Sequence, residues 1–288
     1  MKRTTLLLFF IMIMFVFTSR YLVSRKGLDD VVRNSQEGTR GNYAIVIKNL
    51  KSNDIFMQNE HLVFESASLY KLWVMGAVYK QIKEGKIKED DILSWDISLL
   101  NNFFEIESPS LGGLSSGVIT LTVSDALHQM ITISHNYSAL MLVEKIGISN
   151  LKKFIQELGL KETFVDNHSR TTAYDLVIFF EKLYNGQIID KKYSNKMIAL
   201  LKDQQINDRI PRFLPKSISI GHKTGEIDNF KHDAGIVFAP KGDYIFIVLT
   251  KSESPVGAAE RIATLSKEIF EFFQNRISFT DDVHKYIK

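Results

Sequence analysis

The sequence contains no cysteine. This absence excludes disulfide bonds, thiolate nucleophiles and cysteine-ligated metal sites. Its seven histidines include no His-x-x-x-His pair, and no glycine-rich nucleotide-binding signature occurs. We therefore expect no metal ion and no cofactor, and zinc-dependent hydrolysis is disfavoured.

A basic excess is also missing from the body of the chain. The 288 residues carry a formal net charge of +3, but five basic residues and no acidic ones lie in residues 1–26. The remainder holds 31 basic residues against 33 acidic ones. That balance gives no electrostatic footprint for nucleic acid, so we expect no nucleic-acid partner. The length allows one large domain with a sizeable core, and we expect a monomer.

The N-terminus has the pattern of a targeting segment. Lys2 and Arg3 precede twelve consecutive apolar residues at 6–17, as in a secretory signal. Twelve is short for a membrane span, yet no good small-x-small cleavage site follows. Residues 1–23 are therefore either a cleaved signal peptide or an N-terminal membrane anchor. Both predict that the protein works outside the cytoplasm, secreted or tethered to the outer face of the cytoplasmic membrane.

The order of apolar patterns predicts an α+β fold. Residues 43–50 and 55–57 form a strand hairpin pattern around a turn signal. Helical spacing dominates 86–215. Three strand patterns then follow at 217–222, 234–238 and 244–250, before a closing helix at 256–273. We predict an antiparallel sheet of N- and C-terminal strands flanked by helices, with an inserted all-helical domain.

The predicted division of the chain follows from these patterns. After residues 1–23 comes a polar, glycine-bearing linker, and the chain ends in a short tail. The expected parts are a linker at 24–41, a domain at 42–276 with its helical subdomain at about 86–215, and a tail at 277–288.

The chemistry centres on Ser68-Leu69-Tyr70-Lys71, which stands at the head of a strongly apolar stretch. On a helix, residues three apart share a face, so the Ser68 hydroxyl and the Lys71 amine can meet. Burial would favour the neutral amine, which places a general base beside a nucleophile. The motif alone is weak: Ser68 could equally be a helix N-cap, and a second match occurs from Ser149 to Lys152.

Two later triplets strengthen this interpretation. Ser134-His135-Asn136 lies between two predicted helices, and Lys223-Thr224-Gly225 ends a predicted strand. Simpler accounts are a helix cap for the first triplet and a strand end for the second. Together, the ordered set resembles the class A β-lactamases and the serine penicillin-binding D,D-peptidases, whose motifs are Ser-x-x-Lys, Ser-Asp-Asn and Lys-Thr-Gly.

The resemblance implies a role for each matched residue. Ser68 would form an acyl-enzyme with the help of Lys71, and Ser134 would relay a proton to the departing nitrogen. Asn136 would hold a substrate amide. Lys223 and Thr224 would bind the substrate carboxylate, and Gly225 would let the substrate approach. The oxyanion hole would combine the backbone N–H groups of Ser68 and Glu226.

Two departures from the family pattern stand out. His135 replaces an aspartate, which we expect to alter local hydrogen bonding and leave the chemistry intact. The segment between residues 160 and 171 is short and lacks the Glu-x-x-Leu-Asn motif whose glutamate activates the deacylating water. Glu162, Asp166 and His168 are candidate substitutes, or simply loop residues.

The sequence therefore predicts an exported serine hydrolase that opens β-lactam rings through Ser68 and deacylates slowly, since a missing general base costs about 10²–10⁴ in rate. Two alternatives share the same residues. One is a D,D-peptidase or esterase acting on cell-wall peptides of the D-Ala-D-Ala type. The other is a membrane-anchored penicillin- or muropeptide-binding module in which a stable adduct is the end point.

Overall fold

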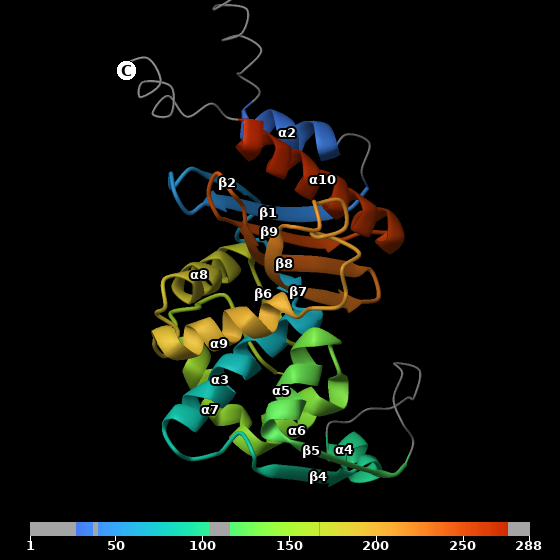
Figure 1. Ribbon diagram of the computed structural model, residues 1–288. Coiled ribbons are helices and arrows are strands. Elements are labelled where there is room, and N and C mark those ends of the chain that lie inside the picture. The colour runs from blue at the N-terminus through green and yellow to red at the C-terminus, as the bar shows by residue number, and fades with distance from the viewer. Residues whose placement is uncertain (1–26, 37–39, 104–115, 167, 276–288) are drawn as a thin grey trace, which may run out of the picture.

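A computed structural model describes residues 27–36, 40–103, 116–166 and 168–275 of the chain. At its centre is a five-stranded antiparallel sheet of strand order β2-β1-β9-β8-β7. Figure 1 shows this sheet between a helical layer above and a larger helical region below. The strands are β1 (Asn42–Asn49), β2 (Ile55–Gln58), β7 (Ser219–Ile227), β8 (Phe230–Phe238) and β9 (Tyr244–Lys251). Strands from both ends of the chain thus share one sheet, which confirms the predicted fold class.

Both faces of the sheet are covered, and strand alternation divides the core in two. In β1, Ala44 and Val46 face the large helical region, whereas Ile45 and Ile47 face the opposite layer. That layer consists of α2 (Leu28–Gln36) and α10 (Pro255–Asn275), which pack against each other. The other face of the sheet packs against the large helical region, and the candidate site described below lies on that side.

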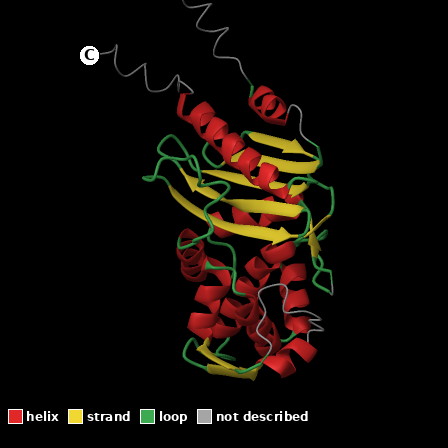
Figure 2. Ribbon diagram, turned by 90° about the vertical axis from the view of Figure 1, so that its right-hand side faces the viewer, coloured by secondary structure: helices red, strands yellow, loops and turns green. Residues whose placement is uncertain are grey.

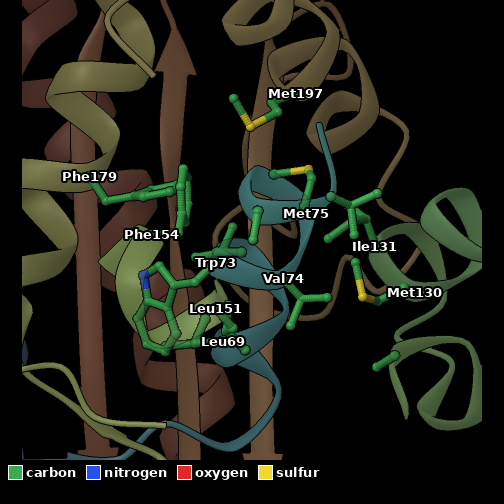
Figure 3. Packing of buried hydrophobic residues seen from close by; sticks show 14 of the residues in the cluster. Leu69, Trp73, Val74, Met75, Met130, Ile131, Leu151, Phe154, Phe179 and Met197 are labelled. Atoms are coloured by element: carbon green, nitrogen blue, oxygen red, sulfur yellow. The ribbon is translucent and has the colours of Figure 1, made fainter. Parts of the chain in front are cut away.

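The inserted region is mainly helical and packs around one buried helix. α3 (Lys71–Lys83) is apolar on nearly all sides, and Figure 3 shows Trp73 and Met75 among side chains from its neighbours. The other helices of this region are α4 (Ile97–Phe103), α5 (Val123–Thr132), α6 (Asn136–Ile146), α7 (Ile148–Glu157), α8 (Ala173–Tyr184) and α9 (Lys191–Lys202), of which α5, α6, α7 and α9 contact α3. A small two-stranded antiparallel sheet of β4 (Ile92–Asp96) and β5 (Val118–Thr122), visible at the bottom of Figure 2, also belongs to this region and was not predicted.

Two other parts of the structure differ from the sequence prediction. The linker predicted at 24–41 contains helix α2, whose Val32 is fully buried against the body. The strand predicted at 217–222 instead runs through β7, so Lys223, Thr224 and Gly225 lie within a strand and not at its end. Pairing with β8 along nine residues extends the strand past the expected turn.

The predicted leader at 1–23 and tail at 277–288 lie outside the described residues. Within the described ranges, no helix has both the length and the apolar character needed to span a membrane.

Candidate active site

Ser68 lies on a short 3₁₀ turn, η1 (Ala67–Tyr70), directly ahead of α3. The turn follows strand β3 (Phe64–Glu65). The N-cap of this turn is Ser66, and the N-cap of α3 is Tyr70. Ser68 caps neither element, so the capping account of Ser68 is wrong. Ala67 has a φ of 43°, a strained conformation for a residue with a side chain. The backbone is thus forced to turn sharply beside a half-buried Ser68.

The segment before Ser68 is bound from two sides. The His232 ring on β8 donates from Nε2 to the Glu65 carbonyl at 2.8 Å and accepts the Thr250 N–H at Nδ1 at 3.0 Å. Because burial dominates, the His232 pKa falls to about 4, and the ring stays neutral at physiological pH. On the other side, Ser66 N–H donates to the Ser169 carbonyl at 2.7 Å. The segment that leads into the Ser68 turn is therefore held in place from both sides.

Gly225 explains how closely β7 approaches this turn. A Cβ atom at position 225 would lie 3.0 Å from both the Ser66 carbonyl oxygen and the Leu69 side chain. Such contacts are too tight for most side chains, so glycine is required by the close approach and not by its φ angle. The strand after Gly225 therefore passes beside the Ser68 turn, which is the arrangement that the predicted Ser68 and Glu226 oxyanion donors need.

Lys71 is fully buried and held by three polar atoms. Its Nζ lies 2.6 Å from the Ser134 carbonyl oxygen, 2.7 Å from Asn136 Oδ1 and 3.2 Å from Ser134 Oγ. Burial lowers the pKa of Lys71 well below its usual value, and the charge of Lys223 lowers it further. A neutral amine can donate to the two carbonyl-type oxygens and keep its lone pair for a hydroxyl proton.

The predicted contact between Ser68 and Lys71 takes a different form. In the described part of the chain, Lys71 Nζ bonds to Ser134 and Asn136, and it makes no hydrogen bond to the Ser68 hydroxyl. The 3₁₀ turn explains the difference, because Ser68 precedes α3 and does not share its regular i, i+3 face. Lys71 and Ser68 are neighbours across one turn, with the Lys71 N–H bonded to the Ser68 carbonyl.

The second triplet lies at the junction of α5 and α6, as predicted. Ser134 has a φ of 57°, which turns it out of the helical path. The cap of α6 is neither Ser134 nor Asn136 but His135, whose Nδ1 accepts the Ser138 N–H at 3.3 Å. The histidine thus performs a local structural task, and the two outer residues are left to contact Lys71.

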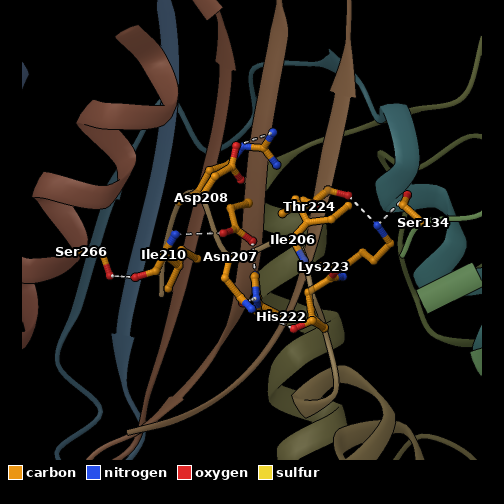
Figure 4. Close-up of polar contacts among 12 residues, drawn as sticks. Ser134, Ile206, Asn207, Asp208, Ile210, His222, Lys223, Thr224 and Ser266 are labelled. Atoms are coloured by element: carbon orange, nitrogen blue, oxygen red, sulfur yellow. Dashed lines mark hydrogen bonds and ion pairs between the residues drawn. The ribbon is translucent and has the colours of Figure 1, made fainter. Parts of the chain in front are cut away.

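Lys223 reaches the same hydroxyl from β7. Its Nζ donates to Ser134 Oγ at 3.0 Å and to the Thr224 carbonyl at 2.8 Å, as Figure 4 shows. Burial lowers the pKa of Lys223 to about 7, against the opposing effect of Asp233. Ser134 Oγ therefore lies between two amines, which is a geometry suited to passing a proton.

Two supporting groups were missed by the sequence interpretation. His222 donates from Nδ1 to Asp233 at 2.8 Å, and its Nε2 lies 3.1 Å from Asn207 Oδ1, which fixes β7 behind Lys223. Arg209, wholly buried, donates to Glu226 at 2.5 Å. Neither group carries a recognisable motif, because each acts only through contacts across the fold.

The three candidate deacylation bases are occupied elsewhere or exposed. Glu162 accepts a bond from Thr172 Oγ1 at 2.7 Å and contacts His61 at 2.9 Å. Asp166 is exposed, caps the following turn and contacts Arg170, and His168 is also exposed. In the described structure, no hydrogen bond joins any of the three to Lys71, Ser134 or Lys223.

The described residues contain no group of three or more metal-ligating side chains. The arrangement offers the half-buried hydroxyl of Ser68, the buried amines of Lys71 and Lys223, and backbone N–H groups close to Ser68. Together these groups suit acyl transfer.

Comparison with known proteins agrees with this geometry. The model of the β-lactamase enzyme family matches residues 25–273. The chain belongs to this family, whose members are hydrolases of the β-lactam amide bond. All three motifs, at 68–71, 134–136 and 223–225, lie within the matched range.

Individual relatives are distant. The chain is 24% identical to β-lactamase BRO-1 of Moraxella catarrhalis over 65% of this chain and 63% of that protein, which is just under two thirds. It is also 24% identical to a β-lactamase of Bacteroides uniformis over 91% of this chain and 98% of the relative. Among solved structures, a mutant of PBP-A in an acyl-enzyme complex with penicillin G has a TM-score of 0.75 at 21% identity, covering 86% of this chain and 96% of that one. That likeness shows the shared fold.

Proposed function

We propose that this protein opens β-lactam rings by forming an acyl-enzyme on Ser68. The observation that carries the proposal is the position of Ser134 Oγ between Lys71 and Lys223, at 3.2 Å and 3.0 Å. Burying two amines beside one hydroxyl carries a desolvation cost in folding free energy, and clusters of such groups are typical of functional sites. Family membership and the solved acyl-enzyme of PBP-A support β-lactams as substrates.

The steps follow from the placement of these groups. Ser68 Oγ attacks the lactam carbonyl carbon while neutral Lys71 removes the hydroxyl proton. The backbone N–H groups of Ser68 and Glu226 stabilise the negative oxygen that forms, a contribution of about 3–4 kcal/mol per donor in comparable enzymes.

The second half of acylation breaks the ring. The C–N bond cleaves, and the nitrogen takes the proton of the Ser134 hydroxyl. Lys71 then returns to Ser134 the proton that it took from Ser68, so that both groups are restored. Protonated Lys223 and the Thr224 hydroxyl bind the substrate carboxylate, and Asn136 holds the substrate amide.

Deacylation is expected to be slow. Glu162 and Asp166 are engaged in bonds away from the lysine pair, so no carboxylate of the short loop is set to activate water. The missing base lowers the rate of that step by about 10²–10⁴. The same feature favours the second candidate function, a penicillin-binding protein whose stable adduct is its product.

The test uses benzylpenicillin and a chromogenic cephalosporin, with intact mass and absorbance as readouts. Ser68 should gain the mass of one β-lactam within minutes and lose it slowly. Ser68→Ala should abolish the adduct, whereas Ser149→Ala should retain it, because the exposed Ser149 begins the second Ser-x-x-Lys match. Fast turnover without an adduct would refute slow deacylation, and an adduct on Ser68→Ala would refute the nucleophile.

We further propose that residues 1–23 direct export and that the protein acts as a monomer. The basic residues and the apolar stretch at 6–17 support export. Cell fractionation with a mass measurement of the recovered protein distinguishes a cleaved signal from an anchor. Recovery in the cytoplasm would overturn the proposal, and light scattering in solution would test the monomer.

A further inference from the structure

His222 lies in a buried polar network on the opposite face of β7 from its chain neighbour Lys223. The histidine is 1% exposed, and Asp233, the cross-strand partner of Thr224, is fully buried. His222 Nδ1 lies 2.8 Å from Asp233 Oδ1, and Asp233 Oδ2 accepts the Ile210 N–H at 3.0 Å. Because an ionised carboxylate only accepts hydrogen bonds, His222 Nδ1 must carry a proton.

The second ring nitrogen of His222 faces an acceptor as well. His222 Nε2 lies 3.1 Å from Asn207 Oδ1, as Figure 4 shows, and a carbonyl oxygen cannot donate a hydrogen bond. The Asn207 amide is oriented by its other end, where Nδ2 donates to the Gln204 carbonyl at 3.1 Å. Gln204 is itself anchored, because its side chain donates to the Ile131 carbonyl in the last turn of α5. His222 Nε2 therefore needs a proton of its own.

A neutral His222 conflicts with these contacts. With the Asn207 amide as it stands, a bare Nε2 and the amide oxygen would be two acceptors facing each other at 3.1 Å. Turning the amide over would let its nitrogen donate to His222, but its oxygen would then face the Gln204 carbonyl. An imidazolium avoids both conflicts, and the charge of the adjacent Asp233 carboxylate offsets the cost of burying it.

The charge of this network acts on Lys223. Burial has the largest effect on the pKa of that amine and lowers it, the negative charge of Asp233 raises it, and Arg209 lowers it further. An imidazolium paired with Asp233 cancels part of the support that this carboxylate gives to the Lys223 proton. The other charged groups around β7 in the described structure are Lys71 on α3, Lys202 on α9, and the two carboxylates that contact Arg209, Asp208 and Glu226.

We propose that His222 is a positioning residue: a buried imidazolium, paired with Asp233, that limits the pH range in which Lys223 attracts a substrate carboxylate. This inference rests on the proposed function, since Lys223 is expected to bind the carboxylate of a β-lactam. The protonation of His222 can be tested without any substrate, which separates the two proposals.

The first test measures the ring nitrogens of His222 by NMR, in the full protein labelled with isotope-enriched histidine and assigned through its backbone. An imidazolium has two protonated nitrogens with similar chemical shifts. A neutral ring has one protonated and one bare nitrogen, whose shifts differ widely. We expect the imidazolium pattern for His222 at about pH 7.

His232 provides the internal control in the same spectrum. It is also fully buried, but its Nδ1 accepts the Thr250 N–H and its Nε2 donates to the Glu65 carbonyl. It should therefore show the neutral pattern, with the bare nitrogen at Nδ1. A bare nitrogen on His222 at the same pH would overturn the inference, whether or not any variant folds.

The second test follows acylation by benzylpenicillin at pH 7 and pH 9, with intact mass as the readout. Because the Lys223 pKa is about 7, the rate constant of the unmodified protein should fall about 50-fold between them. His222→Gln leaves Asp233 unopposed, so Lys223 should keep its proton to a pH about one unit higher, and the fall should shrink to about tenfold. Adding Asp233→Asn to this variant removes both charges and should restore a fall of at least about 50-fold.

His128→Gln is the matched control, because it makes the same substitution at an exposed histidine of α5. Its fall should equal that of the unmodified protein. A merely structural role for His222 would lower the melting temperature and slow acylation equally at both pH values. A fall that stays near 50-fold in a His222→Gln protein that still acylates Ser68 would overturn this inference alone. No acylation of the unmodified protein would overturn the proposed function and the claimed effect on Lys223 with it.

Discussion

The proposed acylation of Ser68 should depend on pH through Lys223, and the size of this effect can be calculated. The amine must be protonated to attract a substrate carboxylate, but burial lowers its pKa to about 7. Below that pH the amine is charged, and above it each pH unit removes about nine tenths of the charged form. For benzylpenicillin, we therefore expect the second-order acylation rate constant to fall about 50-fold between pH 7 and pH 9.

The methyl ester of benzylpenicillin provides the internal control. It has no carboxylate for Lys223 to bind, so its rate constant should depend on the neutral fraction of Lys71 and should not fall over the same range. The Lys71 pKa is lowered well below its usual value, which keeps this base available. Rates at fixed ionic strength, measured by intact mass, give both profiles.

Lys223→Arg provides the matched variant, because a guanidinium remains charged across this range. Its rate constant with benzylpenicillin should not fall between pH 7 and pH 9, whatever its absolute value. Thermal unfolding at each pH checks that both proteins stay folded. The reasoning is refuted if benzylpenicillin reacts equally fast at both pH values with the unmodified protein, or if the ester slows in parallel.

Three further outcomes are expected. Lys71→Arg should lower the acylation rate constant by about 10²–10⁴, because a guanidinium cannot accept the serine proton; a rate within fivefold of the original would show that another group is the base. His135→Ala removes the cap of α6 and should cost about 1 kcal/mol in urea unfolding, while an unchanged midpoint would contradict the capping role. Glu162→Gln should leave the lifetime of the Ser68 adduct unchanged in time-resolved mass spectra, and a longer lifetime would identify Glu162 as a deacylation base.

The pattern of apolar residues was sufficient for much of the fold. Strand periodicity at both ends of the chain and helical spacing between them predicted the mixed composition of the sheet, as the pairing of β1 with β9 confirms. Local pattern failed where contacts decide. Helix α2 is too short and too polar to be recognised from its sequence pattern, and packing on α10 stabilises it.

By itself, the sequence determined which side chains carry the proposed chemistry. Ser68, Lys71 and Lys223 belong to motifs whose residue types and order are informative without coordinates. Their protonation was not readable in that way, because a pKa depends on burial and neighbours that come together only on folding. Only the tertiary structure placed Ser134 between two buried amines.

The tertiary structure also decided what surrounds those residues. It turned His135 into a helix cap, brought Gly225 against the Ser68 turn, and joined Arg209 to Glu226. These contacts link residues distant in the chain or depend on exact backbone angles, and no local pattern encodes either. Short-range motifs therefore indicated the proposed reactive groups, whereas long-range packing set their burial, their pKa values and their spacing.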